Sequence, residues 1–104
     1  MQVGIVRAGA AVHIKPEGEM TIYHAADLKA QMLPAIRSAA EVEIDLSGVS
    51  EMDTAGFQLL VMVKRELAER GQSLRLVGHS PATLEVLDWY QMAGYFGDPV
   101  VLTS

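Results

Sequence analysis

The chain has 104 residues, half of them hydrophobic and a fifth charged, which fits one folded domain with its own core and argues against intrinsic disorder. Its net charge is -5 and it has no basic run, so nucleic acid and anionic membrane surfaces, which need clustered cations, are unfavourable partners. It contains no cysteine, which excludes disulfides, thiol chemistry and zinc fingers.

The first residues do not have the order of a signal peptide. Met1 to Val12 is apolar but is interrupted by Arg7 and Gly9, whereas a signal peptide places charge before an apolar run. The longest uninterrupted apolar run, Leu59 to Val63, is far shorter than a membrane span. We therefore expect a cytoplasmic protein, one domain over residues 1–104, with no direct membrane insertion.

Two short strands are expected at the beginning of the chain, Val3–Arg7 and Ala11–Lys15, separated by the flexible Ala8-Gly9-Ala10. We expect Pro16-Glu17-Gly18 to turn the chain toward a third strand at Glu19–Ile22.

A helical pattern follows from His24. Its apolar positions are Ala25, Leu28, Met32, Ala35 and Ile36. Pro34 lies inside this pattern, and because proline lacks an N–H group and crowds the preceding turn, we expect it to kink or split the helix.

The next segment changes from strand to helix. Val42, Ile44 and Leu46 alternate with acidic residues, which is the period of a half-exposed strand, and Ser47-Gly48 ends it. A long helix is expected from Ala55 to Gly71. Its buried stripe is Leu59, Leu60, Val63 and Leu67.

The start of this helix has two candidate caps and an excess of apolar residues. Either Asp53 or Thr54 can satisfy the first unpaired N–H groups. Phe57, Val61 and Met62 lie off the buried stripe, so something apolar should cover them. One interpretation is a neighbouring element of the same domain; the other is a surface on which a partner protein docks.

The remaining chain predicts a strand at Ser73–Val77 and a helix capped by Ser80, with Pro81 at its first position. The apolar face of that helix is expected at Leu84, Leu87, Trp89 or Tyr90, and Met92. A last strand is expected at Val100–Leu102. Strands that alternate with helices imply an α/β fold with a mixed sheet of about four to five strands and helices packed on it.

No pattern for catalysis, a cofactor or a metal stands out. The segment from Gly78 to Ala82 resembles a nucleophile elbow around Ser80 but lacks the final glycine, and Pro81 removes an N–H group. His13, His24 and His79 do not have metal-ligand spacing. We therefore expect a protein that is not an enzyme; a small enzyme or ligand binder using Asp53, His79 and Ser80 is the less favoured alternative.

Thr54 is informative because of its position. A phosphate there adds about -1.5 to -2 charges, which the N-terminus of a helix stabilises but Asp53 and an apolar partner surface do not. Phosphorylation could therefore release a partner without unfolding the domain. The simpler alternative is that Thr54 only caps the helix.

Several segments together resemble the STAS domain of anti-sigma factor antagonists. They are Val42–Val49, Met52–Phe57, Leu74–Val77 and Ser80-Pro81-Ala82. The resemblance implies a STAS-type sheet and a phosphorylated hydroxyl directly after the Asp, which here is Thr54. It also implies that the unmodified protein binds a serine kinase that is the anti-sigma factor, through the start of the long helix. The implied partner-binding residues are Asp53, Thr54, Ala55, Gly56, Phe57, Val61 and Met62.

The sequence departs from the antagonists at two places and is similar to two other groups. The antagonists usually have Ser where this chain has Thr54, and often an Asp in the loop that here reads Thr21-Ile22-Tyr23. Asp53-Thr54-Ala55-Gly56 also resembles the cytoplasmic STAS subunit of the bacterial lipid-asymmetry transporter, in which this threonine contacts the ATPase. Stand-alone STAS proteins that accompany chemotaxis kinases are similar as well.

Overall fold

The computed structural model describes residues 1–89, with side chains described as far as Val86. The elements are β1 (Gln2–Ala8), β2 (Ala11–Met20), α1 (Ala25–Arg37), β3 (Glu41–Asp45), β4 (Val49–Met52), α2 (Thr54–Glu69), β5 (Ser73–Val77) and α3 (Pro81–Trp89). The expected strand at Val100–Leu102 and the side chains of Leu87, Trp89, Tyr90 and Met92 lie outside this description.

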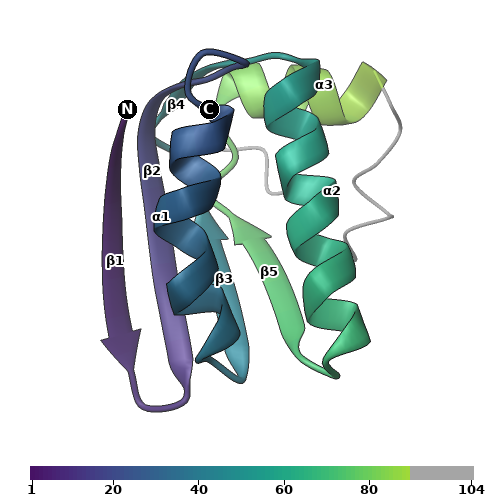
Figure 1. The fold of residues 1–104 in the computed structure, drawn as a ribbon. Coiled ribbons are helices and arrows are strands. Elements are labelled where there is room, and N and C mark those ends of the chain that lie inside the picture. The colour runs from purple at the N-terminus through teal and green to yellow at the C-terminus, as the bar shows by residue number, and fades with distance from the viewer. Residues whose placement is uncertain (90–104) are drawn as a thin grey trace.

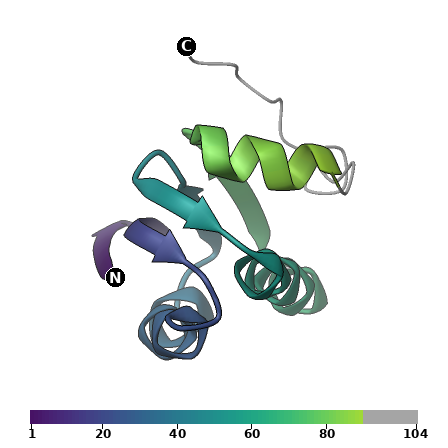
Figure 2. The same ribbon diagram turned by 90° about the horizontal axis from the view of Figure 1, so that it is seen from above.

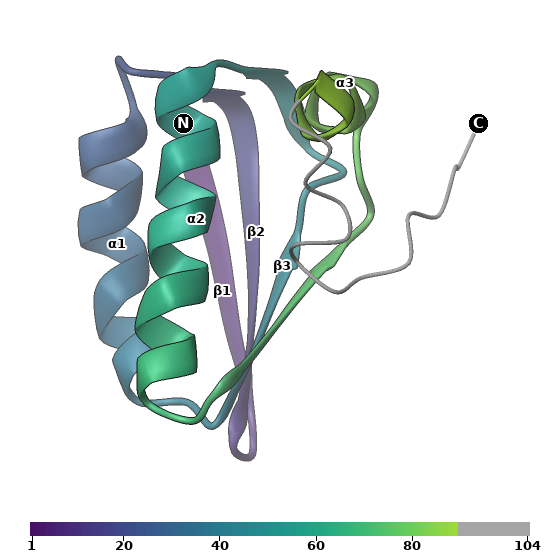
Figure 3. The ribbon, with the colours of Figure 1, turned by 90° about the vertical axis from the view of Figure 1, so that its right-hand side faces the viewer.

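The strands form a mixed sheet, as the sequence predicts. Its order is β1-β2-β3-β5, and β4 pairs with the far end of β2. β1 and β2 are an antiparallel hairpin, whereas the other pairings are parallel. Parallel neighbours need crossover connections, and α1 and α2 provide them on one face of the sheet (Figure 1, Figure 3).

The prediction that Pro16-Glu17-Gly18 turns the chain is wrong, because β2 continues through these residues to Met20. Residues 11–14 of β2 pair with β3 and residues 18–20 pair with β4. Pro16 lies in the gap between these two ladders, where a missing N–H group interrupts neither of them. Only Glu19 and Met20 of the expected strand at Glu19–Ile22 belong to β2, and the chain has left the strand at Thr21 and Ile22.

Two further details differ from the sequence prediction. α1 runs from Ala25 to Arg37 without a break, although Pro34 lies inside it. Pro34 and Ala30 are both exposed, so the Ala30 carbonyl that loses its helical donor faces water. The sequence pattern also missed β4, because the strand has only four residues and mixed polarity.

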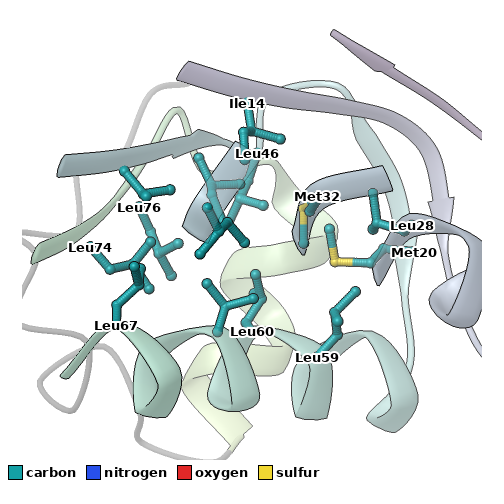
Figure 4. Packing of buried hydrophobic residues seen from close by; sticks show 14 of the residues in the cluster. Ile14, Met20, Leu28, Met32, Leu46, Leu59, Leu60, Leu67, Leu74 and Leu76 are labelled. Carbon is teal, nitrogen blue, oxygen red and sulfur yellow. The ribbon is translucent and has the colours of Figure 1, made fainter. Parts of the chain in front are cut away.

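The core lies between the sheet and the two crossover helices. Leu67 of α2 lies beside Leu74 of β5, whereas Leu59 lies toward Met20 of β2 (Figure 4). Leu60 lies between them. On the α1 side, the buried residues are Met20, Leu28, Met32 and Ile36. The predicted stripe of α2 is thus confirmed as buried, and so is that of α1 except Ala25, which is half-buried.

α3 lies on the opposite side of the strands from α1 and α2 and packs beside β4 (Figure 2, Figure 3). Ser80 caps it as predicted, because its hydroxyl accepts a hydrogen bond from the Thr83 N–H group at 3.2 Å. No helix within residues 1–89 has the length and apolar character needed to cross a membrane.

Candidate docking site at the start of α2

The site is created by the parallel pairing of β2 and β4. Met20 and Met52, the last residues of the two strands, are partners in the ladder, so the chain leaves both strands at the same place. The N-terminal ends of α1 and α2 consequently lie at one end of the molecule (Figure 1). This arrangement brings the loop at residues 21–24 beside Asp53 and Thr54.

Asp53 is the N-cap of α2 and also holds the neighbouring loop. One carboxylate oxygen accepts the Gly56 N–H group at 3.0 Å, and the other accepts the Ile22 N–H group at 2.9 Å. Burial raises the pKa of Asp53, but the N–H donors, chiefly those of Ile22 and Gly56, outweigh it and leave the pKa below its ordinary value. Asp53 therefore carries its negative charge at neutral pH and fixes two segments at once.

Gly56 lets α2 approach the end of β2. A Cβ atom at this position would overlap the carbonyl oxygen of Met20, so any other residue would force the helix away from the strand. Gly56 is buried and Ala55 is half-buried. These two residues set the position of the helix and offer little side-chain surface to a partner.

Thr54 is the first residue of α2 and its side chain is exposed. It follows the cap directly, so a group attached to its hydroxyl would lie at the positive end of the helix dipole. The residue is thus in contact with solvent at the start of the helix.

The expectation that Phe57 and Val61 contribute to an exposed apolar patch is wrong. Phe57 is 3% exposed and Val61 is 9% exposed, so the first of the two interpretations holds for them: the domain covers them itself. Met62 is only partly buried and packs against the core. Phe57, Val61 and Met62 are therefore part of the packing of the domain itself.

The exposed apolar surface lies instead in the loop between β2 and α1. Ile22 is 68% exposed and Tyr23 is 86% exposed, and the Ile22 N–H group is the one that Asp53 accepts. Sequence reasoning missed this pair because it placed Ile22 at the end of a strand and began the helical pattern at His24, directly after Tyr23. The available signal was two large apolar residues that belong to neither buried pattern. We name Ile22, Tyr23 and Thr54 the loop-helix surface.

Two exposed carboxylates lie near the ends of β2 and β4, one residue before Met20 and Met52. Glu19 and Glu51 are partners in the β2 and β4 ladder, and both are exposed. With Asp53 beside them, they make this end of the molecule acidic.

The other candidate residues from the sequence do not join this site through any described contact. The Ser80 hydroxyl is hydrogen-bonded with Thr83. His79 is buried. Within residues 1–89, no cluster of three or more His, Asp or Glu residues could hold a metal ion.

Comparison with known proteins agrees with this architecture. The family model described as "Mlab, STAS domain" matches residues 3–103. The anti-sigma-B factor antagonist of Bacillus subtilis strain 168 is 27% identical over 77 residues, which cover 74% of this chain and 71% of that protein.

Solved structures of anti-sigma factor antagonists share the fold. The antagonist from Mycobacterium paratuberculosis superposes with a TM-score of 0.85 at 19% identity, covering 97% of this chain and 86% of the other. The antagonist SpoIIAA gives 0.78 in its unphosphorylated form, over 95% of this chain and 89% of the other, at 20% identity. Its phosphorylated form, from Bacillus, gives 0.73 over 95% and 92%, also at 20% identity. The chain therefore belongs to the STAS domain family.

Proposed function

We propose that this protein is a non-catalytic regulatory module that docks a serine/threonine kinase of the anti-sigma type through the loop-helix surface. Thr54 is the switch: the unmodified protein binds and the phosphorylated protein is released. The observation that carries the proposal is that Thr54 is exposed and follows Asp53, whose carboxylate binds the N–H group of Ile22 in a loop with two exposed apolar side chains.

The exposed pair is suited to anchor a partner. Tyr23 and Ile22 are the two most exposed large hydrophobic residues among those described, and they are adjacent. Burial of such side chains at an interface stabilises the complex, and tyrosine is among the residues that most often dominate binding energy. Because the Ile22 N–H group is bound to Asp53, the loop loses less conformational entropy on binding than a mobile loop would.

Phosphorylation of Thr54 would act on the complex more than on the fold. The dianion would lie at the N-terminus of α2, where the helix dipole stabilises it. In the complex, the same charge would be desolvated against an apolar contact and would lie beside Asp53, its neighbour in the chain. The bound state therefore loses more stability than the free state, and the partner is released.

The comparisons support a partner-switching role. The related protein from Bacillus subtilis is an anti-sigma-B factor antagonist, and SpoIIAA is known in a phosphorylated form. The match to the Mlab family model favours a second candidate, a subunit that binds the ATPase of a lipid transporter through the same surface and is never phosphorylated.

The test compares wild type with Thr54→Ala, Thr54→Glu and Tyr23→Ala in affinity capture from the native cells, followed by binding measurements with the purified partner. Ser73→Glu is the charge control, because Ser73 is exposed at the start of β5, near the other end of α2. We expect a protein kinase to bind wild type and Thr54→Ala, and to lose affinity for Thr54→Glu and Tyr23→Ala.

The outcomes separate the two functions. Two results together support the switch. Mass spectrometry detects phosphothreonine at residue 54, and Thr54→Glu loses binding whereas Ser73→Glu keeps it. Capture of an ATP-binding cassette ATPase without phosphothreonine selects the transporter subunit. Equal binding by Thr54→Ala and Thr54→Glu removes Thr54 as the switch.

A further inference from the structure

We propose that two copies of this chain associate through β1, which pairs antiparallel with β1 of the second copy around a two-fold axis at Ile5. This interface is distinct from the loop-helix surface and does not depend on the proposed function.

β1 is an edge strand without the usual protection. It pairs with β2 over seven consecutive residues in one unbroken register, and within residues 1–89 no strand pairs with its outer edge. It has no proline, and Arg7 is its only charged residue. A long, regular, weakly charged edge offers free N–H and C=O groups to another strand.

β1 exposes two large apolar side chains besides Gln2 and Arg7. Val6 is 64% exposed and Ile5 is 38% exposed, and with Ile22 and Tyr23 they are the exposed large hydrophobic residues among those described. Val6 is the partner of His13 in the ladder, so it lies on the face of the sheet opposite α1. Ile5 is the partner of the buried Ile14 and faces the helix side.

The sequence of β1 is complementary to itself in one register. With Ile5 on the two-fold axis, Val6 of each copy lies opposite Gly4 of the other. Gly4 and Val6 line a hollow of about 320 Å³ on the open face, so the projecting valine of one copy meets the side of the strand where the other has no side chain. Each contact occurs twice, as two-fold symmetry requires.

For two copies of this chain, the charge of Arg7 favours the antiparallel orientation. A parallel pairing in register would place Arg7 beside Arg7 of the other copy, which is destabilising. In the antiparallel register, Arg7 lies opposite Val3, and the two arginines are four residues apart along the strands, about 13 Å. Arg7 can therefore keep its hydrogen bond to the Ser38 hydroxyl at 2.6 Å.

Because the chain has no cysteine, single cysteines test this register directly. Ile5→Cys places two thiols opposite each other, within the range that a disulfide spans. Val6→Cys is the matched control: it is more exposed, but its two copies are diagonal neighbours about 7–8 Å apart, too far for a disulfide. Under mild oxidation, we expect Ile5→Cys to form a covalent dimer and Val6→Cys to remain mostly reduced.

Sedimentation equilibrium of the unmodified chain provides the second measurement. We expect a concentration-dependent dimer, which Val6→Lys weakens on the order of tenfold or more and Ser73→Lys on the other edge strand leaves unchanged. A wild-type chain that remains monomeric up to about 1 mM refutes the proposal. So does a dimer in which Val6→Cys cross-links as readily as Ile5→Cys, because the register would then be different.

Discussion

Asp53 links the N-terminus of α2 to the loop between β2 and α1. Its replacement gives the sharpest test of the structure of the site. Its carboxylate makes two hydrogen bonds to backbone N–H groups, those of Gly56 and Ile22. Asp53→Ala removes both. Loss of the N-cap costs about 1 kcal/mol, and loss of the bond to Ile22 adds about 0.5–1.5 kcal/mol. We expect the free energy of unfolding to fall by about 2 kcal/mol in total.

Asp53→Asn separates the two bonds. Asparagine is as good an N-cap as aspartate, but its side chain has one oxygen and cannot replace both carboxylate acceptors. We expect it to keep the Gly56 bond, lose the Ile22 bond and reduce stability by about 1 kcal/mol or less. The amide of Ile22 should then exchange with solvent faster than in wild type, while the α2 amides keep their protection.

The measurements are urea unfolding followed by circular dichroism and amide exchange followed by NMR. Glu69→Ala is the control, because Glu69 is exposed at the C-terminal end of the same helix, where loss of a negative charge is neutral or slightly stabilising. If Asp53→Ala unfolds at the same urea concentration as wild type, Asp53 does not hold the two segments together.

The pH dependence has a defined sign. The pKa of Asp53 lies below its ordinary value of 3.8 in the folded chain, so the ionised carboxylate stabilises the fold at pH values above 3.8. This contribution is lost as the pH falls from 3.8 through the lower folded-state pKa. Wild type should therefore lose stability more steeply than Asp53→Asn in this acidic range; parallel pH profiles would contradict the assignment.

Three further substitutions test the packing around the site. Gly56→Ala should reduce the free energy of unfolding by about 1–3 kcal/mol despite the better helix propensity of alanine, because its Cβ overlaps the Met20 carbonyl; a more stable variant in urea unfolding would contradict this contact. Leu60→Ala, at a fully buried position, should cost about 2–5 kcal/mol, whereas the exposed Gln58→Ala should change the thermal midpoint little. Gly71 follows the end of α2 with a φ of 69°, which alanine adopts only with strain. Gly71→Ala should therefore reduce the free energy of unfolding by about 1–2 kcal/mol. If the variant and the wild type have the same thermal midpoint, the helix end relaxes to avoid this strain.

Most of the fold could be predicted because the buried patterns are strictly periodic. The alternation of Val42, Ile44 and Leu46 with acidic residues predicts that these three lie on the buried face of a strand, and all three are buried. Asp53 was one of two possible caps, and the structure selects it because its carboxylate accepts the Gly56 N–H group. Local rules failed where a tertiary partner changed the outcome, as at Pro16, which continues a strand between two separate ladders.

The candidate site also has features that the sequence predicts and features that depend on the tertiary structure. The sequence by itself limited the cap to Asp53 or Thr54 and placed a hydroxyl at the start of α2, because helix termini have local chemical requirements that these residues meet. The need for glycine at residue 56 comes from its tertiary contact with Met20. Only the tertiary structure decided which apolar side chains reach solvent. It buries Phe57 and Val61 and exposes Ile22 and Tyr23, because burial depends on what packs against a residue, and here the parallel pairing of β2 with β4 brings a loop from 31 positions away in the sequence to Asp53.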